Sequence, residues 1–249
     1  MENSGFYSNW EQFKHICKHY NRYFDISQDG IRENLLKSIE PVFHQMETIL
    51  GTNNLIYRAR AVKENQKYGL NSKPDIGPAP IESSKNNRMS PAGISYLYAA
   101  ENEDTCIKET KISPGQQLII GTLKPKRNLK IVDLSSDCLT CSGSIYDTGH
   151  DHPDVWPKDF VYAFASEISK PISEDKKDIE YVPTQLLSEY IRMIGYDGIS
   201  YKSSQDKNYK NFTFFCGPKI KHMPYYPFIR EHLAEYTDFF DIVDIKVLN

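Results

Sequence analysis

The sequence predicts a mixed α+β domain preceded by a helical N-terminal segment, and two observations support this fold class. In the first fifty residues, apolar side chains recur at three- and four-residue steps, which is the spacing of amphipathic helices. From Leu55 onward, short β-rich runs bounded by Gly, Pro, Asn or Asp alternate with short helical stretches. We therefore divide the chain into a helical segment, residues 1–51, and a second domain, residues 52–249.

The helical segment is expected to contain two helices. The first follows the apolar stripe Trp10, Phe13, Ile16, Cys17 and Tyr20. The second begins near Ile31, and the spacing of Met46 and Ile49 extends it to Leu50, with a kink or break at Pro41. Gly51 is expected to cap its end.

The second domain is expected to contain six strands and two helices. The strands are Leu55–Ala59, Ser95–Ala100, Gln117–Leu123, Leu129–Leu134, Asp197–Tyr201 and Asn211–Phe215. One helix spans Glu101–Lys111 with Asn102 as its N-cap, and the other spans Thr184–Ile194. Residues 64–87, 138–157 and 169–178 are expected to be loops, which at such lengths tend to be lids, binding loops or insertions.

Composition narrows the class of protein. Of 249 residues, 39% are hydrophobic and 25% are charged, which is typical of a soluble globular protein. The net charge of −3 gives no overall attraction to nucleic acid or to an anionic membrane, so neither is expected as a partner. No apolar run approaches the roughly 18 residues of a membrane helix, and the N-terminus is unlike a signal peptide. Five cysteines are an odd and sparse count, so no disulfide framework is expected, and a cytoplasmic location is expected.

Three groups of residues contain side chains that can bind metal ions, but none of the three predicts a metal site. Cys138 and Cys141 form a single C-x-x-C pair without a second pair. His150–Asp154 is an acidic and histidine-rich stretch of an expected loop, where such residues are usually solvated. His15 and His19 lie one helical turn apart, which is more often a polar helix face. No G-x-G-x-x-G or Walker motif occurs, so a Rossmann phosphate site is not expected.

The stretch RMSPAGISYLYAAENEDTCIKE carries the most chemical information. Tyr96 and Tyr98 share one face of its expected strand, because strand side chains alternate. In the following helix, Glu109 shares a face with Cys106 and Ile112, which predicts a carboxylate turned inward. Such a carboxylate near arginines and tyrosines can stabilise positive charge that develops on a sugar ring.

The same stretch resembles the RES domain family, which is named for a recurring arginine, glutamate and serine. Arg88, Tyr98 ten positions later and Glu109 eleven further reproduce the family spacing. Upstream, IYRAR resembles the opening strand and places the first family arginine at Arg58. Downstream, YVPTQLLSEYIRMIGYDGISYKSS and NFTFF resemble the closing blocks and place the serine at Ser203, while LKIVDL resembles a segment between the two groups. The resemblance covers about Leu55 to Pro218.

Two positions have close competitors, and one departs from the family pattern. Arg60 competes with Arg58, because both lie on one strand face, and Ser204 competes with Ser203, although the preceding Tyr-x favours Ser203. Met and Ser follow Arg88 where many members have Trp and Asn, which puts local phosphate or ribose contacts in doubt.

The resemblance implies a fold similar to ADP-ribosyltransferase toxins and an activity that cleaves the nicotinamide–ribose bond of NAD, with water or phosphate as acceptor. It implies catalytic roles for Glu109, Tyr98, Arg58 and Ser203. It implies substrate contacts by Arg88, Arg60, Tyr96 and Ser204. NAD is then a substrate rather than a cofactor, and phosphate a possible co-substrate. A neutralising antitoxin protein is the implied partner, and the protein is expected to act as a bacterial toxin or defence effector.

Other readings stay open from the sequence. Transfer of ADP-ribose to a macromolecule breaks the same bond, and a catalytically silent nucleotide-binding module would keep the same site. The N-terminal segment loosely resembles helical segments that precede RES domains in longer members, some grouped with ribonucleases. The ribonuclease motif, Arg followed four to six residues later by His, is absent. The segment is instead expected to cap the catalytic domain or to mediate a homodimer.

Overall fold

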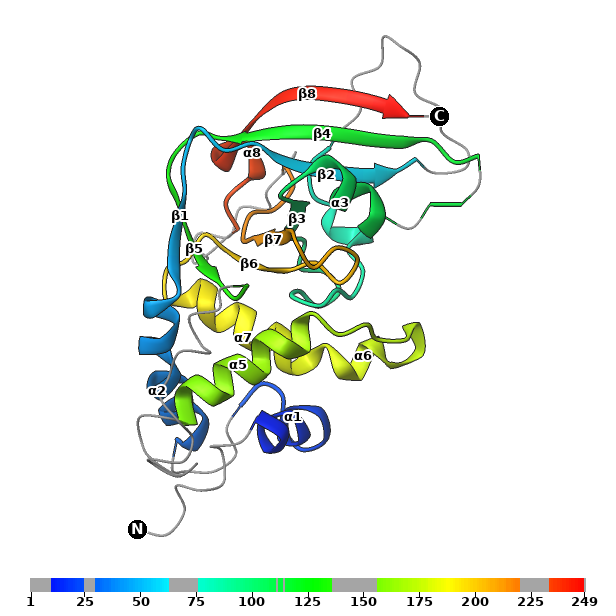
Figure 1. The fold of residues 1–249 in the computed structure, drawn as a ribbon. Coiled ribbons are helices and arrows are strands. Elements are labelled where there is room, and N and C mark those ends of the chain that lie inside the picture. Colours follow the sequence, from blue (N-terminus) through cyan, green and yellow to red (C-terminus); the bar gives the residue numbers. More distant parts are fainter. Residues whose placement is uncertain are drawn as a thin grey trace, which may run out of the picture.

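The computed structural model describes residues 10–24, 30–62, 76–110, 112–113, 115–135, 156–219 and 233–248. Its centre is an eight-stranded sheet in the order β1-β5-β6-β7-β3-β2-β4-β8 (Figure 1). The strands are β1 (Glu47–Leu50), β2 (Ile56–Ala61), β3 (Leu97–Ala100), β4 (Leu118–Pro125), β5 (Leu129–Asp133), β6 (Gly198–Lys202), β7 (Lys210–Phe214) and β8 (Phe240–Leu248). Only β5 and β6 run parallel among these neighbours, so the described sheet is mixed. The predicted α+β class is confirmed.

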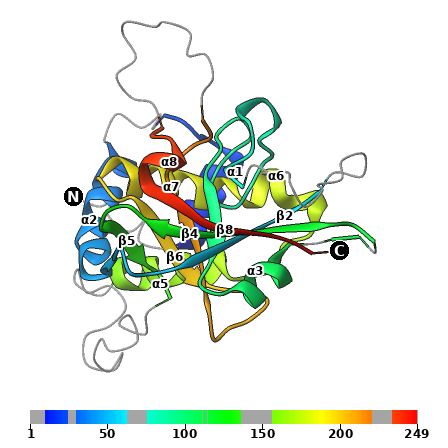
Figure 2. The same ribbon diagram turned by 90° about the horizontal axis from the view of Figure 1, so that it is seen from above.

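Most of the described helices lie below the strands in the view of Figure 1, whereas the short helices α3 (Glu103–Glu109) and α8 (Tyr236–Phe239) lie beside them. The α-helices are α1 (Trp10–His19), α2 (Ile31–Gln45), α3 (Glu103–Glu109), α5 (Trp156–Ile168), α6 (Lys177–Glu180), α7 (Val182–Met193) and α8 (Tyr236–Phe239). Two short 3-10 turns, η1 (Ile81–Ser83) and η3 (Glu174–Lys176), lie in segments predicted to be loops. Seen from above, β2, β4 and β8 pass over the helices (Figure 2), and Figure 1 shows α1, α2, α5, α6 and α7 below the strands.

Two apolar clusters hold the described chain together. One joins the N-terminal helices to α5 and α7, with Phe13, Phe43, Phe160 and Phe164 among its buried members. The other lies among the strands and α8, and includes Ile56, Leu97, Phe214 and Phe240. Because α1 and α2 share an apolar cluster with α5 and α7, they are not packed as an independent unit. The division of the chain at residues 51 and 52 stays a prediction.

Several element boundaries differ from the sequence prediction. The second helix ends at Gln45 and not at Leu50, because Glu47–Leu50 is strand β1, paired antiparallel with β5. Pro41 lies inside α2, which continues past it. Trp156–Ile168 forms α5, although no helix is predicted there. The helix expected at Glu101–Lys111 ends at Glu109, so Ile112 lies beyond it and is exposed.

A buried carboxylate joins the strands that carry part of the site. Asp133, at the end of β5, accepts hydrogen bonds from Ser200 Oγ at 2.8 Å and from Lys210 Nζ at 2.8 Å. Ser135 donates to the same carboxylate through its backbone N–H and its hydroxyl. Burial alone would raise the pKa of the Asp133 carboxyl, but the bonds from Lys210, Ser135 and Ser200 outweigh it and lower that pKa. The bond from Ser200 holds β6 to Asp133, and the ion pair with Lys210 holds β7 to it. Both contacts lie close in sequence to Ser203 and Asn211, the two donors to Glu109.

Candidate active site

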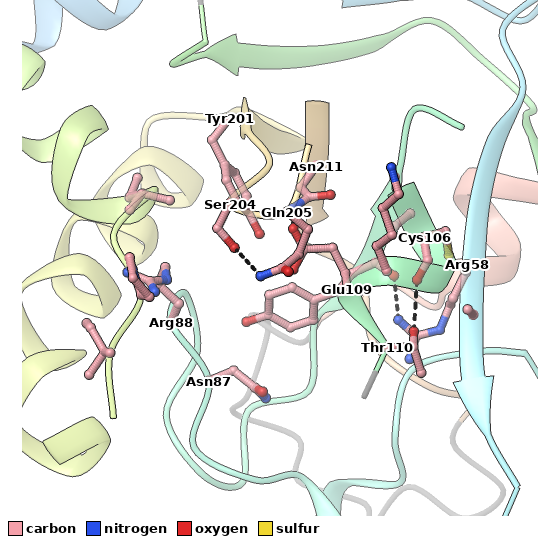
Figure 3. A pocket seen from close by; sticks show the side chains of 18 of the residues that line it. Arg58, Asn87, Arg88, Cys106, Glu109, Thr110, Tyr201, Ser204, Gln205 and Asn211 are labelled. Atoms are coloured by element: carbon pink, nitrogen blue, oxygen red, sulfur yellow. Dashed lines mark hydrogen bonds between the residues drawn. The ribbon is translucent and has the colours of Figure 1, made fainter. Parts of the chain in front are cut away.

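A cavity of about 440 Å³ brings together five of the eight side chains predicted for the site. Its lining includes Arg58, Arg88, Tyr98, Glu109 and Ser204. Figure 3 shows Arg88 and Arg58 on opposite sides, with Glu109 between them. Its walls come from β2, β3, α3, the turn before β3 and the segments that follow α5 and β6. The contiguous motif and the two distant blocks therefore meet at one place in the fold.

Glu109 is the last residue of α3, where the geometry of the helix and of two strands fixes its carboxylate. Asn102 caps the start of this helix, as predicted, by accepting the Thr105 backbone N–H at 2.7 Å. At the other end, the Ser203 hydroxyl donates to Glu109 Oε1 at 2.5 Å and Asn211 Nδ2 donates to the same oxygen at 2.8 Å. Oε2 accepts no hydrogen bond from the part of the chain that the structure describes. One carboxylate oxygen is thus anchored, and the other remains available to a ligand.

Ser203 is oriented by its own hydrogen bonds. The side chain is 1% exposed, and its Oγ accepts the backbone N–H groups of Gln205 and Asp206, each at 3.1 Å. A serine hydroxyl has one hydrogen and two lone pairs, so these two acceptances leave its hydrogen for Glu109. Ser203 itself does not line the cavity, whereas Ser204 does and is exposed. The structure therefore separates the two competing serines by position.

Arg58 lies in the middle of β2 and reaches across to β3. Its Nη1 donates to the Tyr98 carbonyl oxygen at 2.5 Å. The ladder between β2 and β3 contains only the pair Tyr57–Ala100 within the described strands, so this side chain bridges a place where the two strands diverge. Arg60 lies two residues further along the same strand but does not line the cavity. The structure thus distinguishes the two arginines that the sequence left as alternatives.

Arg88 connects the opposite wall of the cavity. Its guanidinium lies over the ring of Tyr181, 5.2 Å from the centroid, which is a cation–π distance. Nη1 donates to the Glu167 carbonyl oxygen at 2.9 Å and Nη2 to that of Lys170 at 2.6 Å. Carbonyl groups at a helix end have no partner within the helix, so Arg88 satisfies the end of α5 while facing the cavity.

Tyr98 and Tyr96 lie in different surroundings. The Tyr98 hydroxyl is hydrogen-bonded to Ser90 Oγ at 3.0 Å, and burial raises its pKa far above the ordinary value, so the phenol is neutral. Tyr96 precedes β3, is 2% exposed and packs edge-on against Phe215 with ring centroids 5.1 Å apart. Tyr96 belongs to the apolar cluster and does not line the cavity.

Comparison with known proteins gives the family. The model of the RES domain matches residues 55–234, which is more than half of the chain. The chain belongs to the RES domain family. Among solved structures, a chain of the crystal structure of the M. tuberculosis MbcT–MbcA toxin–antitoxin complex is similar, with a TM-score of 0.41 and 11% identity over 73% of this chain and 81% of that chain. No curated protein matches.

Asn211 and Tyr201 are among the cavity residues of this RES domain that sequence reasoning did not assign to the site. Asn211 pairs with Ala100 of β3 and Tyr201 of β6, so it lies between the two strands that border Glu109. Tyr201 lines the cavity, and burial raises its pKa to about 12. Both belong to blocks that resemble the family, but only the strand order shows that they lie beside Glu109.

Charge in the cavity of the RES domain is mostly positive. Besides the two arginines, Lys108 and Lys177 line it, and Glu109 is the one carboxylate among the described lining residues. Lys108 is paired with Asp206 at 2.9 Å and Lys177 with Glu174 at 2.6 Å. The balance favours an anionic ligand such as one that carries phosphate groups.

The described residues show no alternative metal or membrane feature. No group of three or more potential ligands among His, Cys, Asp and Glu occurs in the ranges the structure describes. Cys138, Cys141 and the stretch 150–154 lie outside those ranges. His15 and His19 are exposed on α1 with ring centroids 5.0 Å apart, while Cys17 between them is buried. Within the same ranges, no helix has the length and apolar character needed to span a bilayer.

Proposed function

We propose that this RES domain cleaves the nicotinamide–ribose bond of NAD. The observation that carries the proposal is the arrangement of Glu109, which is anchored through Oε1 with Oε2 available, in a cavity that also presents Arg58 and Arg88. Cleavage of this bond develops positive charge on the ribose, and a fixed carboxylate stabilises such charge without having to reorganise. The cavity volume lies within the range of small-molecule sites.

The other lining groups suit the rest of the substrate. Guanidinium groups bind phosphate oxygens through forked donors, which supports contacts from Arg58 and Arg88 to the pyrophosphate. Tyr98 is a neutral aromatic side chain at the wall and can orient the nicotinamide ring. Nicotinamide leaves as a neutral molecule, so departure requires no protonation by the protein. A carboxylate without a paired histidine is therefore sufficient.

The biological role follows from the same proposal. An enzyme that depletes NAD arrests growth, so we propose that this RES domain is a bacterial toxin or defence effector acting in the cytoplasm. An antitoxin protein is the corresponding partner, and its simplest mode of action is to cover the cavity. Its presence would make activity depend on release of the free enzyme.

Product analysis tests the reaction and the acceptor together. Purified protein is incubated with NAD labelled in the adenosine part, with and without phosphate, and the products are separated. Free ADP-ribose supports hydrolysis, and ADP-ribose 1″-phosphate formed only with phosphate supports phosphorolysis. Label retained on a macromolecule would show that the protein transfers ADP-ribose, and would contradict both hydrolysis and phosphorolysis. Intact NAD that is nevertheless bound would identify a silent binding module and overturn the proposal.

The two neighbouring serines give a matched pair of variants. Ser203→Ala removes one of the two donors to Glu109, and we expect kcat to fall by about twentyfold, in line with the loss of a hydrogen bond to a charged group. Ser204→Ala removes an exposed hydroxyl and is expected to change KM more than kcat. Steady-state kinetics of NAD loss measure both. A larger fall of kcat in the Ser204 variant would transfer the role to Ser204.

A further inference from the structure

Helix α1 lies outside the residues that match the RES domain, yet two ion pairs join it to the helices at the cavity wall. Lys14 Nζ lies 3.3 Å from Glu167 Oε2 of α5, and Lys18 Nζ lies 2.5 Å from Glu180 Oε2 of α6. The two lysine side chains are only 13% and 10% exposed. Ion pairs shielded from water to this degree are screened less than ordinary surface pairs. Removing one partner leaves the other charge poorly solvated, which destabilises the contact between the two helices.

The acidic partner of each ion pair either contacts Arg88 or adjoins a residue that does. The backbone carbonyl of Glu167 accepts the hydrogen bond from Arg88 Nη1, and Glu167 also pairs with Lys170, whose carbonyl accepts from Nη2. Glu180 immediately precedes Tyr181, the residue whose ring lies under the Arg88 guanidinium. The position of Arg88 therefore depends on the ends of α5 and α6, and α1 contacts both.

Aromatic contacts also hold α1 against α5. The ring of Trp10 meets that of Phe160 at a centroid distance of 5.4 Å, and Phe13 meets the same ring at 5.3 Å. A ten-residue helix is marginal by itself in water, so α1 owes its structure to these tertiary contacts. Figure 1 shows α1 below α5 and α6, on the side away from the sheet.

We propose that Lys14 and Lys18 are positioning residues for Arg88, so that docking of α1 sets the affinity of the cavity for its anionic substrate. The N-terminal helix is then a control element: displacement of α1 loosens the Arg88 wall and leaves the Glu109 wall unchanged. The expected effect on substrate affinity rests on the proposed cleavage of NAD. The expected loosening of the residues around Arg88 does not depend on that proposal.

The first test uses a charge exchange in the full chain without nucleotide. Lys18→Glu places two carboxylates together, and the double variant Lys18→Glu, Glu180→Lys restores an opposite pair. We expect amide hydrogen exchange in residues 85–92 and 176–182 to rise about tenfold in the single variant and to return in the double variant. Lys37→Glu, at an exposed pair with Glu33 on α2, is the matched control and should leave these segments unchanged.

Exchange that stays at the wild-type rate in folded Lys18→Glu would overturn the proposal, as would a double variant that does not recover. Lys18→Met, which removes the charge without repulsion, replaces the single variant if Lys18→Glu does not fold.

The second test separates binding from chemistry. In Lys18→Glu we expect KM for NAD to rise about tenfold with kcat within about twofold, and the charge exchange to restore KM. A fall in kcat with KM unchanged would contradict a role in placing Arg88. If the wild-type protein does not consume NAD at all, the proposed function fails, while the exchange measurement still decides whether α1 positions Arg88.

Discussion

Replacing Glu109 with Gln is expected to lower kcat for NAD cleavage by about a thousandfold, the upper range for removal of one electrostatic stabiliser. Glutamine has the shape of glutamate, and its carbonyl oxygen can accept the hydrogen bonds from Ser203 and Asn211. The substitution therefore removes the charge while leaving its surroundings in place. NAD consumption by the purified variant is the measurement, and its thermal unfolding should match that of the wild-type protein.

Glu103 provides the control for this substitution. It lies on the same short helix and accepts a hydrogen bond from Lys246 at 2.7 Å, but it does not line the cavity. We expect Glu103→Gln to keep kcat within about twofold. A kcat for Glu109→Gln within fivefold of wild type would remove Glu109 from the mechanism.

Arg58→Lys is expected to weaken NAD binding by about a hundredfold, because breaking a hydrogen-bonded charge contact costs roughly 2–5 kcal/mol. The guanidinium holds the Tyr98 carbonyl through Nη1, and a guanidinium has five donors in a fixed planar fork, whereas an ammonium is a single point charge. A lysine retains the positive charge, but its single ammonium group cannot donate both to the Tyr98 carbonyl and to a phosphate oxygen in the geometry of the guanidinium. Calorimetric titration of NAD in the Glu109→Gln background measures binding without turnover.

Arg60→Lys in the same background is the matched control, since Arg60 shares the strand but not the cavity. We expect its NAD affinity to stay within about twofold. Equal losses in the two variants would show that any guanidinium group on this strand supports NAD binding, and would contradict a specific role for the position of Arg58.

The fold was largely predictable because most strands have a local signal. Six β-rich runs of the sequence became strands, with ends shifted by a few residues. Glu47–Leu50 was predicted as helix because Met46 and Ile49 continue the helical spacing, and its pairing with β5, about eighty residues later, overrides that pattern. β8 was not predicted. It lies at the edge of the sheet, with side chains that are largely exposed, and lacks a regular alternation.

Five of the eight side chains predicted for the site line one cavity, and their catalytic and binding roles stay predictions. Arg58 and Arg60 are neighbours in one strand pattern, as Ser203 and Ser204 are in another, so the sequence favours Arg58 and Ser203 only through the family resemblance and leaves Arg60 and Ser204 as competitors. The choice depends on contacts from distant parts of the chain, such as the bond between Ser203 and Glu109 across 94 positions. Asn211 escaped notice for the same reason, because its proximity to Glu109 follows from the order of β6, β7 and β3.

The long separation between Glu109 and its two donors has a consequence for protein synthesis. Ser203 and Asn211 follow Glu109 by 94 and 102 positions, and β6 and β7, which carry or border them, pair only after both have been made. A chain still growing on the ribosome therefore carries Glu109 for many seconds, at roughly 5–20 residues per second, before its carboxylate can be anchored. Chains that stop before Asn211 lack this arrangement, so the anchored carboxylate forms only after the chain has been made through β7.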